Sequence, residues 1–464
     1  MVQQDSGQLE GDHVDVVVVG MGPGGEDAAA RLARAGLAVV GVDARLVGGE
    51  CPYYACIPTK MMVRAADALG EARRVDQLAG SAQVQPDWTP VATRIRDEAT
   101  ANWNDTAAVD RFERAGGRFV RDRARITGPG EVTVATSTGE RIFKPSKAIL
   151  LNPGTSPAVP EGLAGTPFWT NREAVPAGQV PESLVVLGGG PVGCEFAQIF
   201  ARFGAHVTVI QRAPRLLPRD EPEAAQVLAG VFDHEGIDVR THVTVSRISQ
   251  ADGTFTLDLD DGSTLTARQV LAAAGRTTDL PALGVAAIGL DDQAKAIQVD
   301  EKMRAAERVW AIGDITGKGA FTHVSMYQSR IAVADILGEE VEDADYRALP
   351  RVTFTDPEIA AVGLTEADAA KQGLQVRTGS TAVATSTRGW IHQMGYDGLI
   401  KLVEDVDRGV LVGATVAGPA AGEVLGALAV AVHGEVPVTT LRQMIWAYPT
   451  FHRGIEAALE DLTG

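Results

Sequence analysis

The stretch VDVVVVGMGPGG, which occupies residues 14–25, decides the fold class of this chain. Its first half is an apolar run rich in valine and predicts a buried strand, and its second half has the spacing Gly20-x-Gly22-x-x-Gly25. An alanine-rich segment from Glu26 to Ala35 follows and is typical of a helix. Strand, glycine turn and helix in this order predict a dinucleotide site, because glycines let the backbone approach a pyrophosphate at the helix N-terminus.

A second apolar run, Leu37 to Val42, ends at Asp43, which lies 18 residues after Gly25. A carboxylate at the end of the second strand can bind the hydroxyl groups of a ribose. A lone glycine motif also occurs in ordinary loops, but the strand, the helix and Asp43 around this one favour a nucleotide site. We therefore expect Gly20, Gly22, Gly25 and Asp43 to contact a dinucleotide.

The same order of elements returns 168 residues later (188 − 20). The turn reads Gly188-x-Gly190-x-x-Gly193, and it is preceded by a predicted strand, 183–187, and followed by a predicted helix, 194–203, and a strand, 205–210. The position of Asp43 is taken here by Gln211, and Arg212 comes next. Gln211 lacks the charge that would repel a 2′-phosphate and Arg212 can pair with one, which favours NADPH over NADH. The alternative is that Arg212 is a solvated surface arginine.

The stretch GGECPYYACIPTK, at residues 48–60, holds two of the three cysteines, Cys51 and Cys56, and leads into a predicted helix, 61–74. Residues five apart in a regular helix are too distant for a disulfide, so a bond would require a distorted helix start, to which Pro58 contributes. A helix start and the charge of Lys60 both lower a thiol pKa. Because no further Cys or His stands nearby, a redox pair is favoured over a metal centre and over two unbonded core cysteines.

Length, charge and hydropathy exclude several classes of protein. The 464 residues suffice for about three domains. Lys and Arg number 42 against 60 Asp and Glu, and the net charge of −18 disfavours nucleic acid as a partner. No apolar run reaches the ~18 residues of a membrane span, and residues 1–13 are polar and acidic, unlike a signal peptide. We therefore expect a cytoplasmic protein without a membrane partner.

Other segments give coarser predictions. Residues 86–116, between the two glycine turns, are predicted to be helical, and residues 297–299 are predicted to form a strand. From Leu349 onward, strand-like stretches at 399–404 and 409–416 mix with a helical stretch at 422–433, which predicts a separate α+β domain.

The string Gly-Gly-x-Cys-x-x-x-x-Cys-x-Pro-x-Lys at residues 48–60 resembles the signature of the class I pyridine nucleotide-disulfide oxidoreductases, a family that includes dihydrolipoyl dehydrogenase, glutathione reductase and mercuric reductase. The resemblance implies an α/β fold with two Rossmann-like three-layer domains, one for FAD and one for NAD(P)H, and a C-terminal α+β domain that forms a homodimer. We expect residues 1–155 and 275–346 to form the FAD-binding domain, residues 156–274 the NAD(P)-binding domain, and residues 347–464 the dimerisation domain.

The resemblance also implies roles for single residues. Cys51 and Cys56 would form a redox-active disulfide, with Cys56 as the thiolate that faces the flavin and Cys51 as the thiol that meets the substrate. Glu195 would pair with Lys60, and Asp314, in the stretch 309–314, would bind the ribityl chain of FAD. The alternatives are a carboxylate on the helix dipole for Glu195 and a helix N-cap for Asp314. No metal site is expected, and the remaining expected cofactor contacts are Gly49, Lys60, Gly154, Gly275 and Gly313.

The C-terminal segment departs from the family pattern. The family's disulfide reductases end in His-Pro-Thr-x-x-Glu, in which the His of the partner subunit is the acid–base and the Glu orients it. Here Tyr448 occupies the His position and Arg453 the Glu position, while His452 is either a substitute or an interface histidine. No cysteine follows Cys194, which we expect to be a buried structural thiol, so the second cysteine pair of mercuric reductases is absent.

Together these features predict an FAD-dependent, homodimeric NAD(P)H oxidoreductase with an unidentified small-molecule acceptor. The alternatives are a mercuric-reductase-like reductase of metals or quinones, an enzyme similar to 2-ketopropyl coenzyme M oxidoreductase/carboxylase that cleaves a C–S bond, and a subunit docked in a dehydrogenase complex.

Overall fold

The computed structural model describes residues 14–137 and 139–462, which divide into two compact units. Within these ranges the first unit comprises residues 14–58, 96–156 and 276–345, and the second comprises residues 59–95, 157–275 and 346–462. The segment 1–13, on which the expectation about a signal peptide rests, lies outside the described residues. No helix in the described ranges is both long enough and apolar enough to cross a membrane.

The first unit is built on a six-stranded sheet whose strand order is β17-β18-β7-β1-β2-β3. All neighbouring pairs are parallel except β17 and β18. The strands are β1 (Val16–Val19), β2 (Val39–Asp43), β3 (Arg118–Arg121), β7 (Ala148–Leu151), β17 (Arg304–Ala306) and β18 (Val309–Ala311). Every residue of β1 is a buried valine, as is typical of a parallel strand that is covered on both faces.

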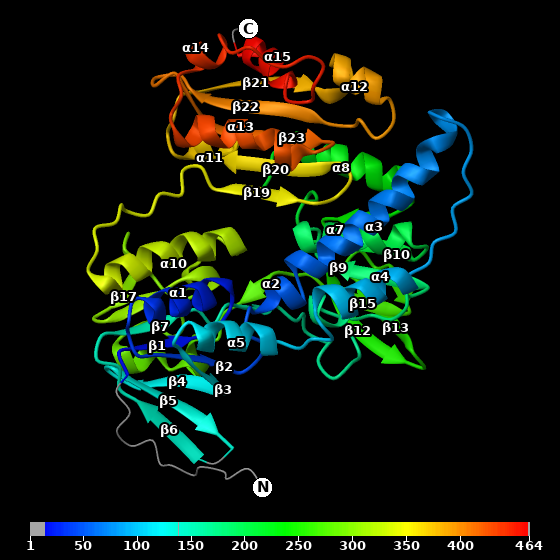
Figure 1. The fold of residues 1–464 in the computed structure, drawn as a ribbon. Helices are drawn as coiled ribbons and strands as arrows, with labels where there is room; N and C mark the ends of the chain where they lie inside the picture. The colour runs from blue at the N-terminus through cyan, green and yellow to red at the C-terminus, as the bar shows by residue number, and fades with distance from the viewer. Residues whose placement is uncertain (1–13, 138, 463–464) are drawn as a thin grey trace. The chain divides into compact units, whose positions relative to one another are not determined.

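Both faces of this sheet carry a hydrophobic core. Val16 and Val18 pack with α1 (Pro23–Arg34) and α10 (Thr322–Leu337), which lie side by side in Figure 1. Val17 and Val19 pack toward a three-stranded antiparallel sheet on the other face. Its strands are β4 (Arg123–Gly128), β5 (Glu131–Thr136) and β6 (Gly139–Phe143). The period of two along β1 therefore gives the unit its three layers.

Close backbone packing explains the glycines of the first turn. Gly20 has φ +93°, and a Cβ at this position would lie 2.2 Å from the carbonyl oxygen of Asn152. A Cβ on Gly25 would lie 2.1 Å from the carbonyl oxygen of Gly20. Only residues without a side chain fit at these two positions, and α1 begins directly between them.

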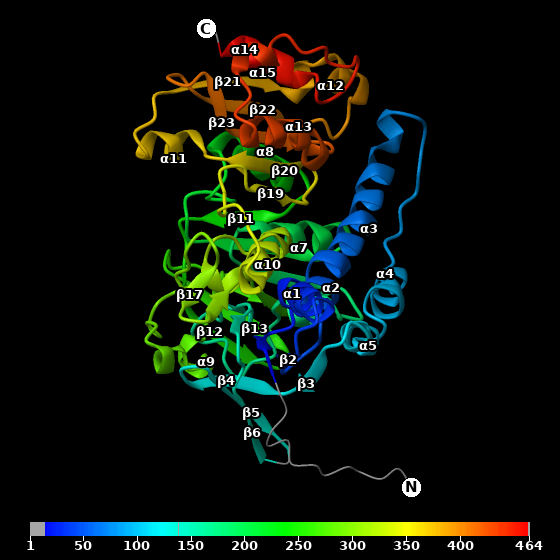
Figure 2. The same cartoon turned by 60° about the vertical axis from the view of Figure 1, so that its left-hand side comes forward.

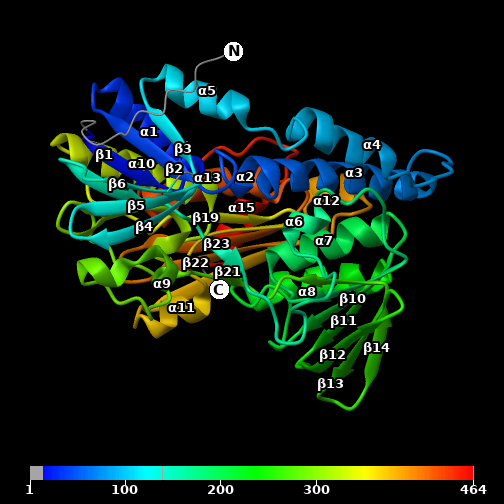
Figure 3. The same ribbon diagram turned by 90° about the horizontal axis from the view of Figure 1, so that it is seen from below.

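The second unit contains three sheets. The parallel sheet has the order β11-β10-β9-β15 and is flanked by α7 (Pro191–Arg202) and α8 (Pro222–His234). Its strands are β9 (Ser183–Leu187), β10 (His206–Gln211), β11 (Asp238–Thr241) and β15 (Gln269–Ala272). Figure 3 shows a small antiparallel sheet near β10 and β11; it consists of β12 (Val245–Ala251), β13 (Thr254–Leu259) and β14 (Thr264–Ala267).

The C-terminal part of this unit is an antiparallel sheet in the order β19-β20-β23-β22-β21, with helices at its faces, as Figure 2 shows in yellow to red. The strands are β19 (Pro350–Thr353), β20 (Glu358–Gly363), β21 (Val376–Ala382), β22 (Leu399–Asp405) and β23 (Val410–Gly418). The helices are α11 (Glu366–Lys371), α12 (Thr387–His392), α13 (Ala421–His433), α14 (Val438–Leu441) and α15 (Gly454–Asp461). The predicted fold class, two parallel α/β sheets with a C-terminal α+β part, is confirmed.

One local prediction is confirmed in part and one is wrong. Residues 86–116 are largely helical, as predicted, but they divide into α4 (Thr89–Arg94), a π-helical turn (Ile95–Ala99), a turn and α5 (Thr106–Arg114). Three consecutive residues with φ between +48° and +56°, 101–103, interrupt the helix, because a right-handed helix requires negative φ. Residues 297–299 form no strand, and the Ile297 N–H donates instead to the carbonyl oxygen of Ile315.

The glycine of the second turn provides a test of the fold. Gly188 has φ +117°, and a Cβ on it would lie 2.3 Å from the carbonyl oxygen of Ala273. We expect Gly188→Ala to lower the free energy of unfolding, because both the conformation and the contact exclude a methyl group.

Gly230→Ala is the matched control for this substitution. Gly230 lies within α8, and its Cβ would meet open space, so we expect a gain of about 0.5–1 kcal/mol from helix propensity. Thermal or urea unfolding of both variants checks the pair. Equal stabilities of the two variants would contradict this reading of the turn.

Candidate functional site

The two cysteines of the stretch 48–60 lie on either side of a helix break. Cys51 belongs to α2 (Glu50–Tyr53), and Cys56 is the first residue of α3 (Cys56–Arg74). The break falls at Tyr54, whose φ of −138° and ψ of 1° are not helical. This interruption is the distorted helix start that we expected. Both thiols are partly buried, and the Cys56 Sγ lies 3.5 Å from the hydroxyl oxygen of Thr322 at the start of α10.

Lys60 forms an ion pair with Glu195 in the second unit. The Lys60 Nζ donates to the Glu195 Oε2 at 2.7 Å, and the Glu195 side chain is 8% exposed. The other carboxylate oxygen, Oε1, accepts from the Phe354 N–H at 2.9 Å. The Lys60 ammonium also lies 4.6 Å from the centre of the Phe354 ring, within range of a cation–π contact. Glu195 is therefore fixed at both oxygens, and the charge of Lys60 is held in one place.

The carboxylate of Asp43 closes the first glycine turn. Its two oxygens accept the backbone N–H groups of Met21 and Arg45, each at 2.7 Å. Burial raises the pKa of Asp43, while the two backbone hydrogen bonds act in the opposite direction. Gly22 is the N-cap of α1. Because glycine has no side chain, the cap residue provides no side-chain acceptor to the first N–H groups of the helix.

Arg276 joins three segments of the first unit, and the sequence did not single it out. Its Nη2 donates to the Glu50 carboxylate at 3.0 Å and to the Thr155 carbonyl oxygen at 2.7 Å. The Thr155 hydroxyl in turn donates to the Asp314 carboxylate at 3.0 Å. Asp314 itself lies in a short 3-10 turn beside Gly313, which has φ +76°. The position of Arg276 directly after Gly275 is the one sequence signal that could have drawn attention to it.

The remaining glycines predicted at the cofactors fall into two groups. Gly49 (φ +67°) and Gly193 are packed against backbone, since a Cβ would lie 2.8 Å from the Gly22 Cα and 1.9 Å from the Gly188 oxygen respectively. At Gly154, Gly190 and Gly275 an added Cβ would meet nothing within 4 Å among the described residues. Open space at these three positions is compatible with the close approach of a ligand.

Gln211 and Arg212 differ in their surroundings. Gln211 is buried; its Oε1 accepts from the Gly189 N–H at 3.4 Å and its Nε2 donates to the Arg215 carbonyl oxygen at 3.2 Å. The amide therefore closes the second turn much as Asp43 closes the first. Arg212 is exposed, and no hydrogen bond or ion pair of its side chain is found within residues 14–137 and 139–462.

The C-terminal residues that replace the His–Glu pair contact one another. The Arg453 guanidinium lies 5.5 Å from the centre of the Tyr448 ring and its Nη2 pairs with Glu456 at 2.8 Å. The ring of His452 lies 5.9 Å from that of Trp446. The Tyr448 side chain is 66% exposed. All of these residues belong to the second unit, whereas Cys51 and Cys56 belong to the first.

A buried arginine, Arg202, is the largest structural feature that sequence reasoning missed. Its side chain is 2% exposed and pairs with Asp67 at 2.8 Å, with Glu235 at 2.6 Å and with Asp356 at 2.7 Å. Arg74, near the end of α3, also pairs with Asp356 at 2.7 Å. The sequence signal for this cluster was an arginine in the largely apolar last turn of α7. Its partners could not be named from the sequence, because they are distant in the chain.

The carboxylates of this cluster have shifted pKa values. Burial raises the pKa of Asp67 to about 6, although Arg202 opposes this shift. Burial would also raise the pKa of Asp356, but the charges and hydrogen bonds of Arg202 and Arg74 outweigh it and lower the pKa. Burial raises the pKa of the Cys194 thiol well above its ordinary value, with a further contribution from Glu195. Cys194 is fully buried, as expected for a structural thiol.

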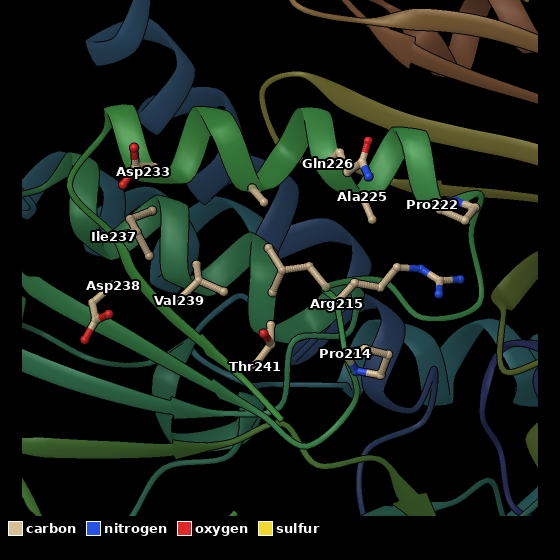
Figure 4. Close-up of a pocket in the computed structure, with 12 residues that line it drawn as sticks. Pro214, Arg215, Pro222, Ala225, Gln226, Asp233, Ile237, Asp238, Val239 and Thr241 are labelled. Atoms are coloured by element: carbon tan, nitrogen blue, oxygen red, sulfur yellow. The ribbon is translucent and has the colours of Figure 1, made fainter. Parts of the chain in front are cut away.

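Two cavities lie close to the glycine turns. A cavity of about 560 Å³ lies between α8 and β11, and Figure 4 shows the residues that line it. It is lined by Arg215, Asp233, Ile237, Thr241 and neighbouring residues, and by none of the predicted site residues. A smaller cavity of about 210 Å³ in the first unit is lined by Gly48, Pro52, Tyr53, Thr100 and Asn104, among others. No group of three or more His, Cys, Asp or Glu side chains that could hold a metal ion occurs in the described part of the chain.

Comparisons with known proteins match almost the whole chain. A family model described as pyridine nucleotide-disulphide oxidoreductase matches residues 14–329, and the model of its dimerisation domain matches residues 349–459. A dihydrolipoyl dehydrogenase of Chlorobaculum tepidum is 31% identical over 455 residues, which cover 96% of each chain. A mercuric reductase of Acidithiobacillus ferrooxidans is 30% identical over 462 residues, which cover 98% of this chain and 83% of the relative.

Solved structures of the same kind share the fold. LpdA from Mycobacterium tuberculosis superposes with a TM-score of 0.85 at 25% identity and covers 97% of this chain and 99% of its own. The Cu(II) complex of the HOCl-induced flavoprotein disulfide reductase RclA from Escherichia coli gives a TM-score of 0.84 at 24% identity, with the same coverage.

Proposed function

The chain belongs to the pyridine nucleotide-disulphide oxidoreductase family, and we propose that it passes electrons from NAD(P)H to an acceptor that needs no acid–base pair from the protein, with quinones as the leading class. Its cofactors are those of the family, FAD and NAD(P)H. The observation that carries the proposal is the pair Tyr448 and Arg453, which stands where the family's disulfide reductases have His and Glu.

The residues of the first glycine turn fit FAD. The first turn of α1 has no side-chain cap, so backbone N–H groups and the helix dipole remain available for a pyrophosphate. We infer that Gly20, Gly22 and Gly25 hold this group, that Asp43 binds the ribose, and that Asp314 binds the ribityl chain. Each carboxylate oxygen of Asp43 accepts one backbone N–H and keeps a lone pair for a hydroxyl group.

The second glycine turn fits NAD(P)H in the same way. The N-cap of α7 is Gly190, which also has no side-chain hydrogen bond and faces open space. Gly275, with φ +114°, is open as well. We infer that Gly188, Gly190, Gly193 and Gly275 receive the nucleotide.

The cysteine pair is the route by which we propose that electrons leave the cofactors. FAD, when bound, supplies two-electron transfer from the nicotinamide. Reduction of a Cys51–Cys56 disulfide consumes two electrons and two protons and yields two thiols. Lys60 lies one helical turn after Cys56 in α3, and its ion pair with Glu195 holds the ammonium group in one place.

The missing acid–base pair limits the choice of acceptor. A disulfide substrate needs a proton for its leaving thiolate, and a positioned acid–base contributes about 10²–10⁴-fold to such a step. A phenol is a poor base near neutral pH, and Arg453 cannot orient it as a carboxylate would. A quinone takes two electrons and two protons, and water can supply the second proton. The overall balance is NAD(P)H + H⁺ + quinone → NAD(P)⁺ + hydroquinone.

Mercuric ion is the second candidate acceptor, because mercuric reductases are among the relatives. No cysteine occurs in residues 195–464, so the second thiol pair of those enzymes is lacking. We therefore rank a soft metal ion below quinones.

We infer that the chain forms homodimers. The match to the family's dimerisation domain supports this, as do the exposed apolar side chains of Val430 (69%), Met444 (43%) and Ile445 (99%) in that part. Sedimentation of the purified protein tests it, and a monomer at micromolar concentration would contradict it.

The cysteine assignment can be tested by alkylation. In the FAD-loaded protein under argon, we expect Cys51 and Cys56 to react with iodoacetamide only after NADPH is added. Cys194 is the internal control and should stay unmodified in both states, because it is buried and its thiol pKa is raised. Peptide mass mapping gives the result. Alkylation of both cysteines in the air-oxidised protein would refute the disulfide.

The nicotinamide preference can be tested at Arg212. Because Arg212 is exposed and Gln211 is engaged in the turn, we expect Arg212→Ala to raise the KM for NADPH about tenfold, the scale of one charge-assisted hydrogen bond. The KM for NADH should change less than twofold. Arg247→Ala, which removes another exposed arginine of the same unit, is the control. Equal effects on the KM values for NADPH and NADH would show that Arg212 does not discriminate between the two cofactors.

The acceptor class can be tested by steady-state kinetics. We expect kcat/KM for lipoamide to fall below the ~10⁴ M⁻¹ s⁻¹ of ordinary enzymes, and that for 1,4-naphthoquinone to exceed it. Tyr448→His with Arg453→Glu should raise lipoamide turnover about 10²-fold or more and leave quinone turnover within about threefold. His452→Asn tests whether His452, the other candidate proton donor, takes part in lipoamide reduction. Efficient lipoamide turnover by the wild type that His452→Asn removes would show that His452 supplies the proton.

A further inference from the structure

The loop between the two cysteines carries an aromatic ring that stacks on a second one. Tyr54 lies between Cys51 and Cys56, and its ring centre is 6.4 Å from that of Trp103, with an interplanar angle of 28°. The Trp103 indole Nε1–H donates to the carbonyl oxygen of Tyr53 at 3.2 Å. Trp103 is therefore tied to the cysteine loop both by its ring and by its one polar atom.

The backbone that presents Trp103 is held in an unusual conformation. Ala101, Asn102 and Trp103 have φ of +48°, +56° and +55°, the left-handed region that side-chain-bearing residues rarely adopt. A π-helical turn, Ile95–Ala99, comes directly before them. Both features cluster at functional sites, because they cost free energy and persist only where the surroundings impose them.

Hydrogen bonds impose this conformation from both sides. The Asn102 N–H donates to the Arg96 carbonyl oxygen at 2.6 Å, and the Trp103 N–H donates to the Thr100 hydroxyl at 3.3 Å. After the turn, the buried Asp105 carboxylate accepts from the Val47 N–H at 2.6 Å. Val47 lies just before the stretch 48–60, so the turn and the cysteine loop form one connected structure.

Trp103 is less buried than three of the other tryptophans, and it shares its partly buried state with Trp169, which packs on Phe200. Trp88, Trp310 and Trp446 are 7–8% exposed, as expected of rings that fill a core. Trp103 and Tyr54 are both only partly buried, so their rings keep part of their surface accessible. A cavity of about 210 Å³ adjoins the same loop at Pro52, Tyr53 and Thr100; neither Tyr54 nor Trp103 lines it.

We propose that the stacked pair Tyr54 and Trp103 is a platform that binds a planar aromatic acceptor of the quinone class and sets the preference for it. The proposal rests on the proposed function and names the residues that recognise its acceptor. A flat ring can extend the stack, and offset aromatic contacts contribute free energy beyond the burial of area. The platform positions the acceptor, while the two electrons and two protons follow the balance given above, with NAD(P)H as the reductant.

The test compares an aromatic with a non-aromatic acceptor in the FAD-loaded, full-length enzyme. With saturating NADPH, we expect Trp103→Leu and Tyr54→Leu each to raise the KM for 1,4-naphthoquinone about three- to tenfold, the range of one aromatic contact. The kcat for naphthoquinone and kcat/KM for ferricyanide, which cannot stack, should stay within twofold. Tyr54→Phe keeps the ring and should behave as the wild type. Trp390→Leu, which removes a 74% exposed ring elsewhere, is the control.

A non-reducible probe separates this proposal from the proposed function. The affinity for 2-naphthol, measured by equilibrium dialysis, should fall by the same factor in both leucine variants. If the wild type does not reduce naphthoquinone, the proposed function fails, yet loss of 2-naphthol binding in Trp103→Leu would still support the platform. Unchanged KM and unchanged 2-naphthol affinity in both leucine variants would overturn it. A parallel loss of naphthoquinone and ferricyanide turnover would also overturn it, because the pair would then be purely structural.

Discussion

The inward face of α7 carries the interactions on which the second unit depends. Glu195, Gln198 and Arg202 lie on successive turns and each fixes a segment that is distant in the chain. Glu195 holds Lys60 and the Phe354 N–H, and Gln198 accepts from the Asp356 N–H and donates to its carbonyl oxygen. Arg202 forms ion pairs with three carboxylates. Arg202 is the buried member of these pairs, and its removal would cost the most, because Glu235 and Asp356 would both lose a charged partner.

Under the proposed function, this constraint connects the nucleotide site at the second glycine turn with Lys60, the charge near the cysteines. The helix that begins at the second glycine turn is also the helix that holds Lys60 through Glu195. Since Lys60 belongs to α3, which starts at Cys56, the position of one positive charge follows from the packing of α7. Under the proposed function, Glu195 therefore serves both the packing of the second unit and the placement of the charge of Lys60.

The features that could be predicted from the sequence are those that depend on a local pattern of residues. Both glycine turns have positions where only a missing side chain fits, and such positions leave a signature that needs no tertiary information. The family resemblance supplied the partner of Lys60, and the structure places the two side chains in contact. The expected domain boundaries and the roles of the cysteines stay predictions, because they concern bound cofactors and redox states.

The features that sequence reasoning missed depend on distant residues. Arg202 meets Asp67, which lies 135 positions earlier, and Asp356, which lies 154 positions later. The left-handed residues 101–103 contain no glycine that would announce a turn, and hydrogen bonds to Arg96 and Thr100 impose their conformation. The Tyr448–Arg453 pair departs from the family pattern, and under the proposed function it concerns the acceptor side. The nucleotide-binding turns keep the family pattern.

The Arg202 cluster also has a consequence for proton binding. The pKa of Asp67 is raised from 3.8 to about 6, so the folded protein binds this proton more tightly than the unfolded chain does. Its contribution to stability is complete below pH 3.8 and is lost as the pH rises through about 6. The pKa of Asp356 is lowered, so its contribution is present above pH 3.8 and is lost only in stronger acid. Two carboxyls on one guanidinium thus have opposite proton linkage: between pH 7 and pH 4 protonation of Asp67 adds to folding stability, although it weakens the ion pair of Asp67 with Arg202.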